Sequence, residues 1–135
     1  MSRMRVDAVG ETTSLAERKL RAGQRLLIGL SGTSVTDAER SLIRLVRPAG
    51  FILFKRNVEE PAQVRELNRE LASLVPASRP PILSVDQEGG RVQRVKDGAT
   101  LFPPLRFVGN VGDLDLTRDY ARALAAEVRA CGFNL

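Results

Sequence analysis

The sequence contains no histidine and no tryptophan, and Cys131 is its single cysteine. One cysteine cannot form a disulfide within the chain, and a lone thiol without histidine cannot supply the ligands of a structural zinc site. We therefore expect neither a disulfide framework nor a metal. A reduced, cytoplasmic location is the simplest interpretation of this cysteine usage.

Long apolar runs and aromatic side chains are also scarce. Residues 1–20 include no apolar stretch long enough for a signal-peptide core or a membrane span. Aromatic residues make up 4% of the chain, too few for the stacking platforms of single-strand nucleic-acid binders. The formal charge is +5, but basic residues alternate with acidic ones, as in Arg65, Glu66, Arg69 and Glu70. We expect neither a nucleic-acid partner nor a membrane partner.

What the sequence does contain is an alternation of short apolar runs and amphipathic segments. Apolar runs at 25–30, 50–54 and 82–85 predict buried strands. Ser-x-x-Glu and Thr-x-x-Glu capping boxes at Ser14 and Thr36, and Pro61 at a first helical position, predict three helix starts. A last amphipathic stripe joins Leu116 to Cys131. The order is that of an α/β protein with a parallel sheet.

Periodicity alone leaves two architectures open, an open doubly wound sheet and a closed (β/α)8 barrel. Residues 133–135 read as the start of a fourth strand, which is the midpoint of a barrel of about 250 residues. We therefore predict the N-terminal half of a TIM-type (β/α)8 barrel, with about three βα units in residues 24–135. A tail and a short helix occupy residues 1–23. The unpaired edge strands of a half barrel predict self-association.

The segment from Ser84 to Arg94, Ser-Val-Asp-Gln-Glu-Gly-Gly-Arg-Val-Gln-Arg, is the main candidate site. Asp86 and Glu88 follow the third predicted strand, at the edge of a parallel sheet where active sites form. The pair Gly89–Gly90 allows a tight turn, and Arg91 and Arg94 can hold the two acids by ion pairs. The connection from Asp86 to Asp115 is also long, which is typical of functional loops.

This segment resembles the signature of the family 3 glycoside hydrolases, in their bacterial β-N-acetylglucosaminidase branch. Gly-Phe-Ile-Leu-Phe-Lys-Arg-Asn at 50–57 and Phe-Pro-Pro at 102–104 resemble two further motifs of that branch. The order and the spacing of the motifs agree from about Gln24 to Leu135. The resemblance implies a retaining hydrolase that removes terminal β-linked N-acetylglucosamine from muropeptides during peptidoglycan recycling in the cytoplasm. It implies no cofactor.

The resemblance also assigns roles to individual residues. It implies that Asp86 binds the substrate, since an ionised carboxylate accepts hydrogen bonds from sugar hydroxyls. Arg91 matches a family arginine that either orients Asp86 or Glu88 or contacts the sugar. Arg56 and Asn57 match a pair after the second strand, and Asn57 either shapes a turn or contacts the ligand. Glu88, Gly89 and Gly90 are expected to support the site.

The catalytic residues are expected to lie outside this sequence. A retaining glycosidase needs a nucleophilic carboxylate and a proton donor. The resemblance implies an aspartate on a late barrel strand and a histidine on a mid-barrel loop, and this chain has no histidine. We therefore expect an inactive N-terminal fragment of the enzyme. The alternatives are a non-catalytic carbohydrate-binding or assembly module that needs a second chain, Asp86 and Glu88 as paired catalytic acids, and a phosphate-binding loop at 29–33.

Overall fold

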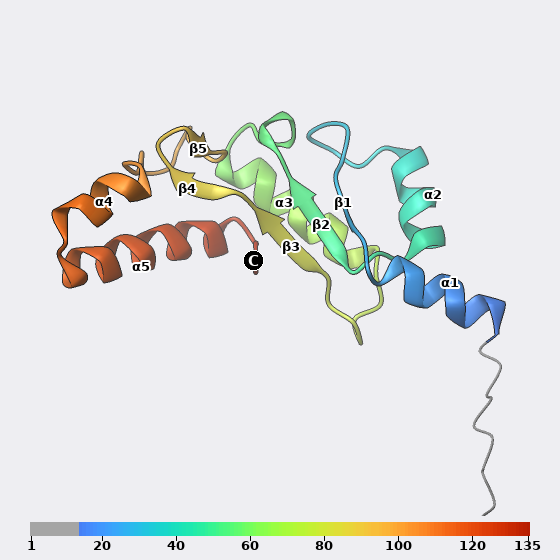
Figure 1. The fold of residues 1–135 in the computed structure, drawn as a ribbon. Coiled ribbons are helices and arrows are strands. Elements are labelled where there is room, and N and C mark those ends of the chain that lie inside the picture. Colours follow the sequence, from blue (N-terminus) through green and yellow to red (C-terminus); the bar gives the residue numbers. More distant parts are fainter. Residues whose placement is uncertain (1–13) are drawn as a thin grey trace, which may run out of the picture.

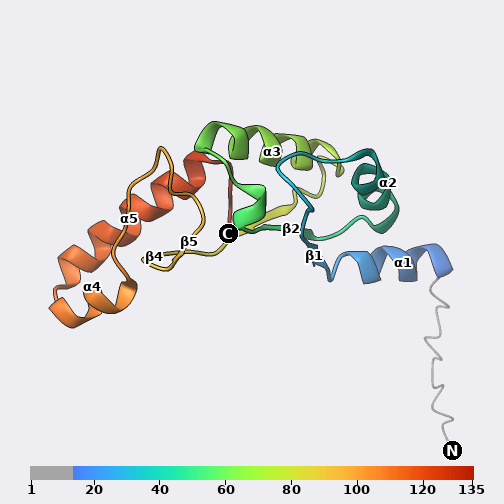
Figure 2. The ribbon, with the colours of Figure 1, turned by 90° about the horizontal axis from the view of Figure 1, so that it is seen from above.

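The structure, a computed structural model, describes residues 14–135, so residues 1–13 of the predicted tail lie outside the described residues. Three strands, β1 (Leu27–Ile28), β2 (Gly50–Leu53) and β3 (Ile82–Val85), form a parallel sheet in that order. Four longer helices alternate with them: α1 (Leu15–Gly23), α2 (Asp37–Val46), α3 (Pro61–Ser73) and α5 (Leu114–Ala130). Figures 1 and 2 show α2, α3 and α5 in an arc on one side of the sheet.

The chain after α5 extends the sheet on the other side of β3. The backbone N–H of Leu135 donates to the carbonyl of Leu83 at 3.1 Å, and the N–H of Val85 donates to the carbonyl of Leu135 at 3.3 Å. These two bonds are those of a parallel pairing. The side chain of Asn134 adds bonds to Leu83 and to the carbonyl of Pro81. The predicted opening of a fourth strand is therefore confirmed in its position beside β3.

The helix starts follow the signals in the sequence. Capping boxes at Ser14 and Thr36 open α1 and α2, and Pro61 is the first residue of α3. Val64, Leu67 and Leu71 of α3 pack with the sheet in the main core, whose other buried members are Leu30, Val35, Ile43, Phe51, Leu53, Leu83, Val95, Cys131 and Phe133. Among the described helices, none is long and apolar enough to cross a bilayer.

The two faces of the sheet differ in burial. Side chains alternate along a strand, so Phe51, Leu53 and Leu83 share the face that the helices cover, and all three are buried. Leu27 and Ile82 lie on the opposite face and are 42% and 37% exposed. The prediction that the first strand is buried is therefore wrong at Leu27, because the described helices cover only one side of the sheet (Figure 2).

The long connection after β3 is more structured than the sequence indicated. It contains an antiparallel hairpin of β4 (Gln87–Gly89) and β5 (Val92–Gln93), followed by the short helix α4 (Leu105–Val111). A second small core of Phe102, Val108 and Tyr120, with Leu124 against it, packs α4 and this connection on α5. The rings of Phe102 and Tyr120 meet edge to face with their centroids 5.2 Å apart. The candidate site is thus built on a folded hairpin and not on an irregular loop.

Candidate functional site

All predicted site residues follow the carboxyl ends of strands. Asp86 follows β3 directly, and Glu88, Gly89, Gly90 and Arg91 lie in the β4–β5 hairpin that comes next. Arg56 and Asn57 lie after β2, in a single 3-10 turn, η1 (Lys55–Asn57). These connections lie at one edge of the sheet, the upper edge in Figure 1. The structure therefore gathers the candidates at the edge where parallel α/β folds build their sites.

Arg94, and not Arg91, forms the ion pair at Asp86. A nitrogen of Arg94 lies 3.7 Å from a carboxylate oxygen of Asp86, and the Asp86 side chain is 48% exposed. Hairpin register explains this choice: Gln87 pairs with Gln93, so Asp86 and Arg94, the residues just beyond that pair, lie near each other. Arg91 lies at the hairpin turn, exposed to solvent. The hypothesis that Arg91 orients Asp86 is therefore not supported by the structure.

The glycine pair forms the turn that the sequence predicted. Gly89 and Gly90 have φ angles of 83° and 58°, in the left-handed region that disfavours side chains. A Cβ on Gly89 would collide with the carbonyl oxygen of Pro103 and the hydroxyl of Tyr120. Glu88, between Asp86 and this turn, has an exposed side chain, and its carbonyl accepts a hydrogen bond from Tyr120. Glu88 therefore contributes to the loop through its backbone.

Asn57 and Arg56 join the loop after β2 to the loop after β1. Asn57 is fully buried, and its amide donates to the carbonyls of Leu30 at 3.0 Å and Gly32 at 2.8 Å. Its side-chain carbonyl oxygen accepts a hydrogen bond from the backbone N–H of Phe54. Arg56 also donates to Leu30, and its guanidinium stacks 4.9 Å from the ring centroid of Phe54. Of the two interpretations of Asn57, the structure favours the turn over contact with a ligand.

The loop at 29–33 is organised around a carboxylate. Glu39 of α2 accepts hydrogen bonds from the backbone and hydroxyl of Ser31 and from the backbone and hydroxyl of Thr36. Burial opposes ionisation of Glu39, but these bonds outweigh it and lower its pKa to about 2. A negative charge therefore already occupies the donors that a phosphate would need. The structure does not support a phosphate site here.

Sequence reasoning missed two residues that shape the hairpin, Gln93 and Tyr120. Gln93 is 3% exposed, donates to the carbonyls of Val95 and Thr100, and accepts from the backbone of Phe102. Tyr120 is the only tyrosine of the chain and lies on the apolar stripe of the last helix. A hydroxyl on a buried stripe needs a partner, and this signal could have identified Tyr120.

Other chemistry is not evident among residues 14–135. Cys131 is buried, and burial raises the pKa of its thiol, with Glu127 adding to the rise and Arg65 opposing it. Such a thiol is a poor nucleophile.

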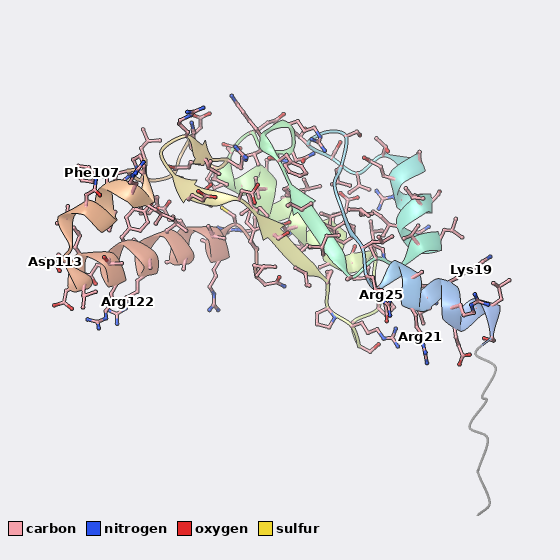
Figure 3. The ribbon with its side chains drawn as sticks, in the orientation of Figure 1. Lys19, Arg21, Arg25, Phe107, Asp113 and Arg122 are labelled. Carbon is pink, nitrogen blue, oxygen red and sulfur yellow. The ribbon has the colours of Figure 1, made fainter. Side chains whose placement is uncertain are left out.

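Within the described part of the chain, no three acidic, cysteine or histidine side chains lie close enough together to hold a metal ion. Lys19, Arg21 and Arg25 gather around α1, away from the hairpin (Figure 3).

The arrangement at Asp86 suits a neutral polar ligand. A partly exposed carboxylate with an arginine beside it offers several acceptor positions and fixed donors at the mouth of the sheet. Sugar hydroxyls can donate to a carboxylate and accept from a guanidinium. The separate cluster of Arg56 and Asn57 is tied to the first loop, and in the described residues no hydrogen bond joins it to the Asp86 pair.

Known proteins resemble this chain closely. The model of the glycosyl hydrolase family 3 N-terminal domain matches residues 16–135. A β-hexosaminidase from Nitrosomonas eutropha is 41% identical over 116 residues, which cover 82% of this chain and 33% of that protein. A β-hexosaminidase from Xylella fastidiosa is 42% identical over the same length. The chain thus spans about a third of the length of the curated relatives it matches.

Solved structures agree with these relatives. A family 3 β-N-acetylglucosaminidase from a Paenibacillus strain superposes with a TM-score of 0.79 at 37% identity, over 86% of this chain and 22% of that one. NagZ from Neisseria gonorrhoeae, in complex with N-trifluoroacetyl-D-glucosamine, superposes with a TM-score of 0.70 at 30% identity. That match covers 80% of this chain and 33% of the NagZ chain.

Proposed function

The chain belongs to glycosyl hydrolase family 3, as part of its TIM-barrel-type N-terminal domain, and from this we propose that it forms one wall of a sugar-binding site. We propose that the whole enzyme is a β-hexosaminidase of the cytoplasm. It would release terminal β-linked N-acetylglucosamine from peptidoglycan-derived muropeptides. Similarity to β-hexosaminidases and to an N-acetylglucosaminidase supports this activity. Similarity to NagZ in complex with N-trifluoroacetyl-D-glucosamine supports an N-acylated glucosamine as the ligand.

Asp86 carries the proposal at the level of residues. It follows β3 directly, faces the same side of the sheet as Ile82 and Ser84, and is partly exposed. We propose that its carboxylate accepts hydrogen bonds from sugar hydroxyls and that Arg94 holds it in place. Gly89 and Gly90 form the supporting turn, and Asn57 and Arg56 fix the adjacent loops.

We further propose that residues 24–135 are the partial barrel and that residues 1–23 precede it as a tail and a helix. We propose that the nucleophile and the proton donor of the reaction lie outside these residues, since the resemblance implies a histidine as proton donor and an aspartate on a later strand, and the sequence contains no histidine. The isolated chain should therefore bind the sugar without hydrolysing it. Turnover of a nitrophenyl N-acetylglucosaminide by these 135 residues would contradict this.

Sugar binding is tested with Asp86→Asn in the full chain. The substitution removes the charge but keeps the shape, so the Kd for N-acetylglucosamine, measured by NMR titration, should rise about tenfold or more. Asp97→Asn is the matched control, since Asp97 is exposed in the same connection with no ion pair among the described residues. Equal affinity of both variants and the wild type would exclude Asp86 as a ligand.

The role of Arg94 is separated from that of Arg91 by the same titration. Arg94→Met removes the ion pair at Asp86 and should weaken N-acetylglucosamine binding by about threefold to tenfold. Arg91→Met removes an exposed guanidinium at the hairpin turn and should change the Kd by less than about twofold. A larger rise in Kd for Arg91→Met than for Arg94→Met would instead identify Arg91 as the residue that orients Asp86.

The second candidate function is a non-catalytic carbohydrate-binding or assembly module that works with a second chain. It shares the Asp86 site, so the sugar titration does not separate it from the enzyme part. A longer polypeptide that contains this segment and binds N-acetylglucosamine without turning over the nitrophenyl substrate would favour the module. Turnover by the longer polypeptide would favour the hydrolase.

A further inference from the structure

We propose that Tyr120 of α5 is a positioning residue for the Asp86 site, because its hydroxyl fixes the turn of the β4–β5 hairpin. The inference rests on the proposed sugar-binding role of Asp86. Tyr120 lies 34 positions after Asp86 along the sequence and belongs to a different element, so neither motif nor spacing assigns it to the site.

The hydroxyl of Tyr120 contacts both the hairpin and the segment that follows it toward α4. The hydroxyl oxygen lies 2.8 Å from the carbonyl oxygen of Glu88 and 2.9 Å from that of Pro103. One proton is shared between these two acceptors, so the hydroxyl bridges the outgoing and returning chain. A tyrosine hydroxyl is protonated at neutral pH and can donate, and burial raises the pKa of Tyr120 further above its ordinary value.

The turn next to this hydroxyl packs closely against α5 and the returning chain. Gly89 is packed so closely on Tyr120 and Pro103 that a Cβ would collide with both. The N–H of Gly90 donates to the carbonyl of Phe102 at 2.8 Å. Phe102 in turn meets the ring of Tyr120 edge to face. The glycine turn is therefore clamped against α5 by one hydroxyl and one aromatic contact.

A fixed turn sets the partner of Asp86. The hairpin pairs Gln87 with Gln93, and Gln87 accepts from the backbone of Arg94 at 2.8 Å, which places Arg94 beside Asp86. A shift of the turn by one residue would bring a different side chain to that position. Glu127, also on α5, holds the far end of the connection through the backbone and hydroxyl of Thr100. Helix α5 thus anchors the site loop at two points.

The test is Tyr120→Phe in the full chain, which removes the hydroxyl and keeps the ring on Phe102. Loss of the bridge should speed hydrogen exchange of the Gly90 amide by about tenfold, and should weaken N-acetylglucosamine binding by about threefold to tenfold. Ile43→Val is the matched control, because it trims a buried side chain of α2 in the main core, outside the second core of Phe102 and Tyr120. The control should lower the unfolding midpoint while leaving both readouts unchanged.

Three results would overturn the proposal or its premise. Unchanged Gly90 exchange in Tyr120→Phe would show that the hydroxyl does not fix the turn. Faster exchange with an unchanged Kd would reduce Tyr120 to a purely structural role. Failure of the wild type to bind N-acetylglucosamine would instead remove the proposed function, and Gly90 exchange would then decide alone whether Tyr120 holds the hairpin.

Discussion

Gly89 combines two demands that no other residue type meets. Its φ angle is 83°, and a Cβ there would collide with Pro103 and Tyr120. Gly89→Ala should therefore lower the free energy of unfolding by about 3 kcal/mol, the sum of backbone strain and displaced packing. Urea unfolding followed by circular dichroism measures this loss.

Gly109 is the matched control for that substitution. It lies inside α4, and a Cβ there would meet nothing within 4 Å. Gly109→Ala should leave stability unchanged or raise it by about 0.5 kcal/mol, because alanine favours a helix over glycine. If the two substitutions had equal effects, steric exclusion at Gly89 would be refuted.

Single residues also show where sequence reasoning succeeds. The motif at 84–94 correctly indicated a tight turn at Gly89–Gly90 and acids at the end of β3. It did not identify the partner of Asp86, because Arg91 and Arg94 are equivalent until the hairpin register is known. The register states which residue of one strand lies opposite which residue of the other. The amino-acid composition of the hairpin does not determine this pairing.

At the scale of elements, Glu39 joins the first loop to the start of α2. Its folded pKa is about 2, below the ordinary value of 4.5, so ionised Glu39 stabilises the fold. This contribution is complete above about pH 4.5 and is lost as the pH falls toward 2. Because Glu39 is partly exposed, solvent screening limits this contribution to about 1 kcal/mol.

Glu39→Gln tests this pH dependence. The variant should be about 1 kcal/mol less stable than the wild type at pH 7, and the difference should shrink between about pH 4.5 and pH 2.5. Urea unfolding at a series of pH values provides the measurement. Glu59→Gln, at an exposed site outside this network, controls for the loss of one negative charge. A difference that stays constant with pH would contradict the assigned role.

Elements with strong local signals were predicted well. The capping boxes at Ser14 and Thr36 and the proline at 61 mark the helix starts that the structure shows. The short α4 and the β4–β5 hairpin were not predicted, because α4 begins without a capping side chain and the hairpin strands contain no apolar run. Both elements contact Tyr120, which lies in a separate part of the chain: Val108 of α4 shares its core cluster, and the carbonyl of Glu88 in the hairpin accepts from its hydroxyl.

At the scale of the whole molecule, the order of strands and helices was enough to predict a parallel α/β fold. Choosing a barrel over an open sheet needed the fourth strand start at 133–135, which the structure places beside β3. The half-exposed face of the sheet could not be predicted from Leu27 or Ile82, since an apolar strand residue reads as buried in either architecture. Burial depends on what covers the face, and the local sequence does not contain that information.

We expect the 135-residue chain to self-associate through its sheet, which exposes the apolar side chains of Leu27 and Ile82 on one face and has two unpaired edges. In the described residues β1 pairs only with β2, and 133–135 pair only with β3, so both edges keep free backbone donors and acceptors. The weight-average mass in sedimentation equilibrium should therefore rise with protein concentration. A mass that stays monomeric at every concentration would contradict this expectation.

Leu27→Lys tests whether the apolar face drives that association. A charge at a side chain that is 42% exposed on this face should weaken self-association by about tenfold or more, since burying a leucine contributes about 2 kcal/mol. Leu114→Lys is the matched control, because Leu114 is 71% exposed at the start of α5, away from the sheet. An equal effect of both substitutions would mean that association uses general surface hydrophobicity. A selective effect of Leu27→Lys would locate the contact on the uncovered side of the sheet, the side that Asp86 also faces.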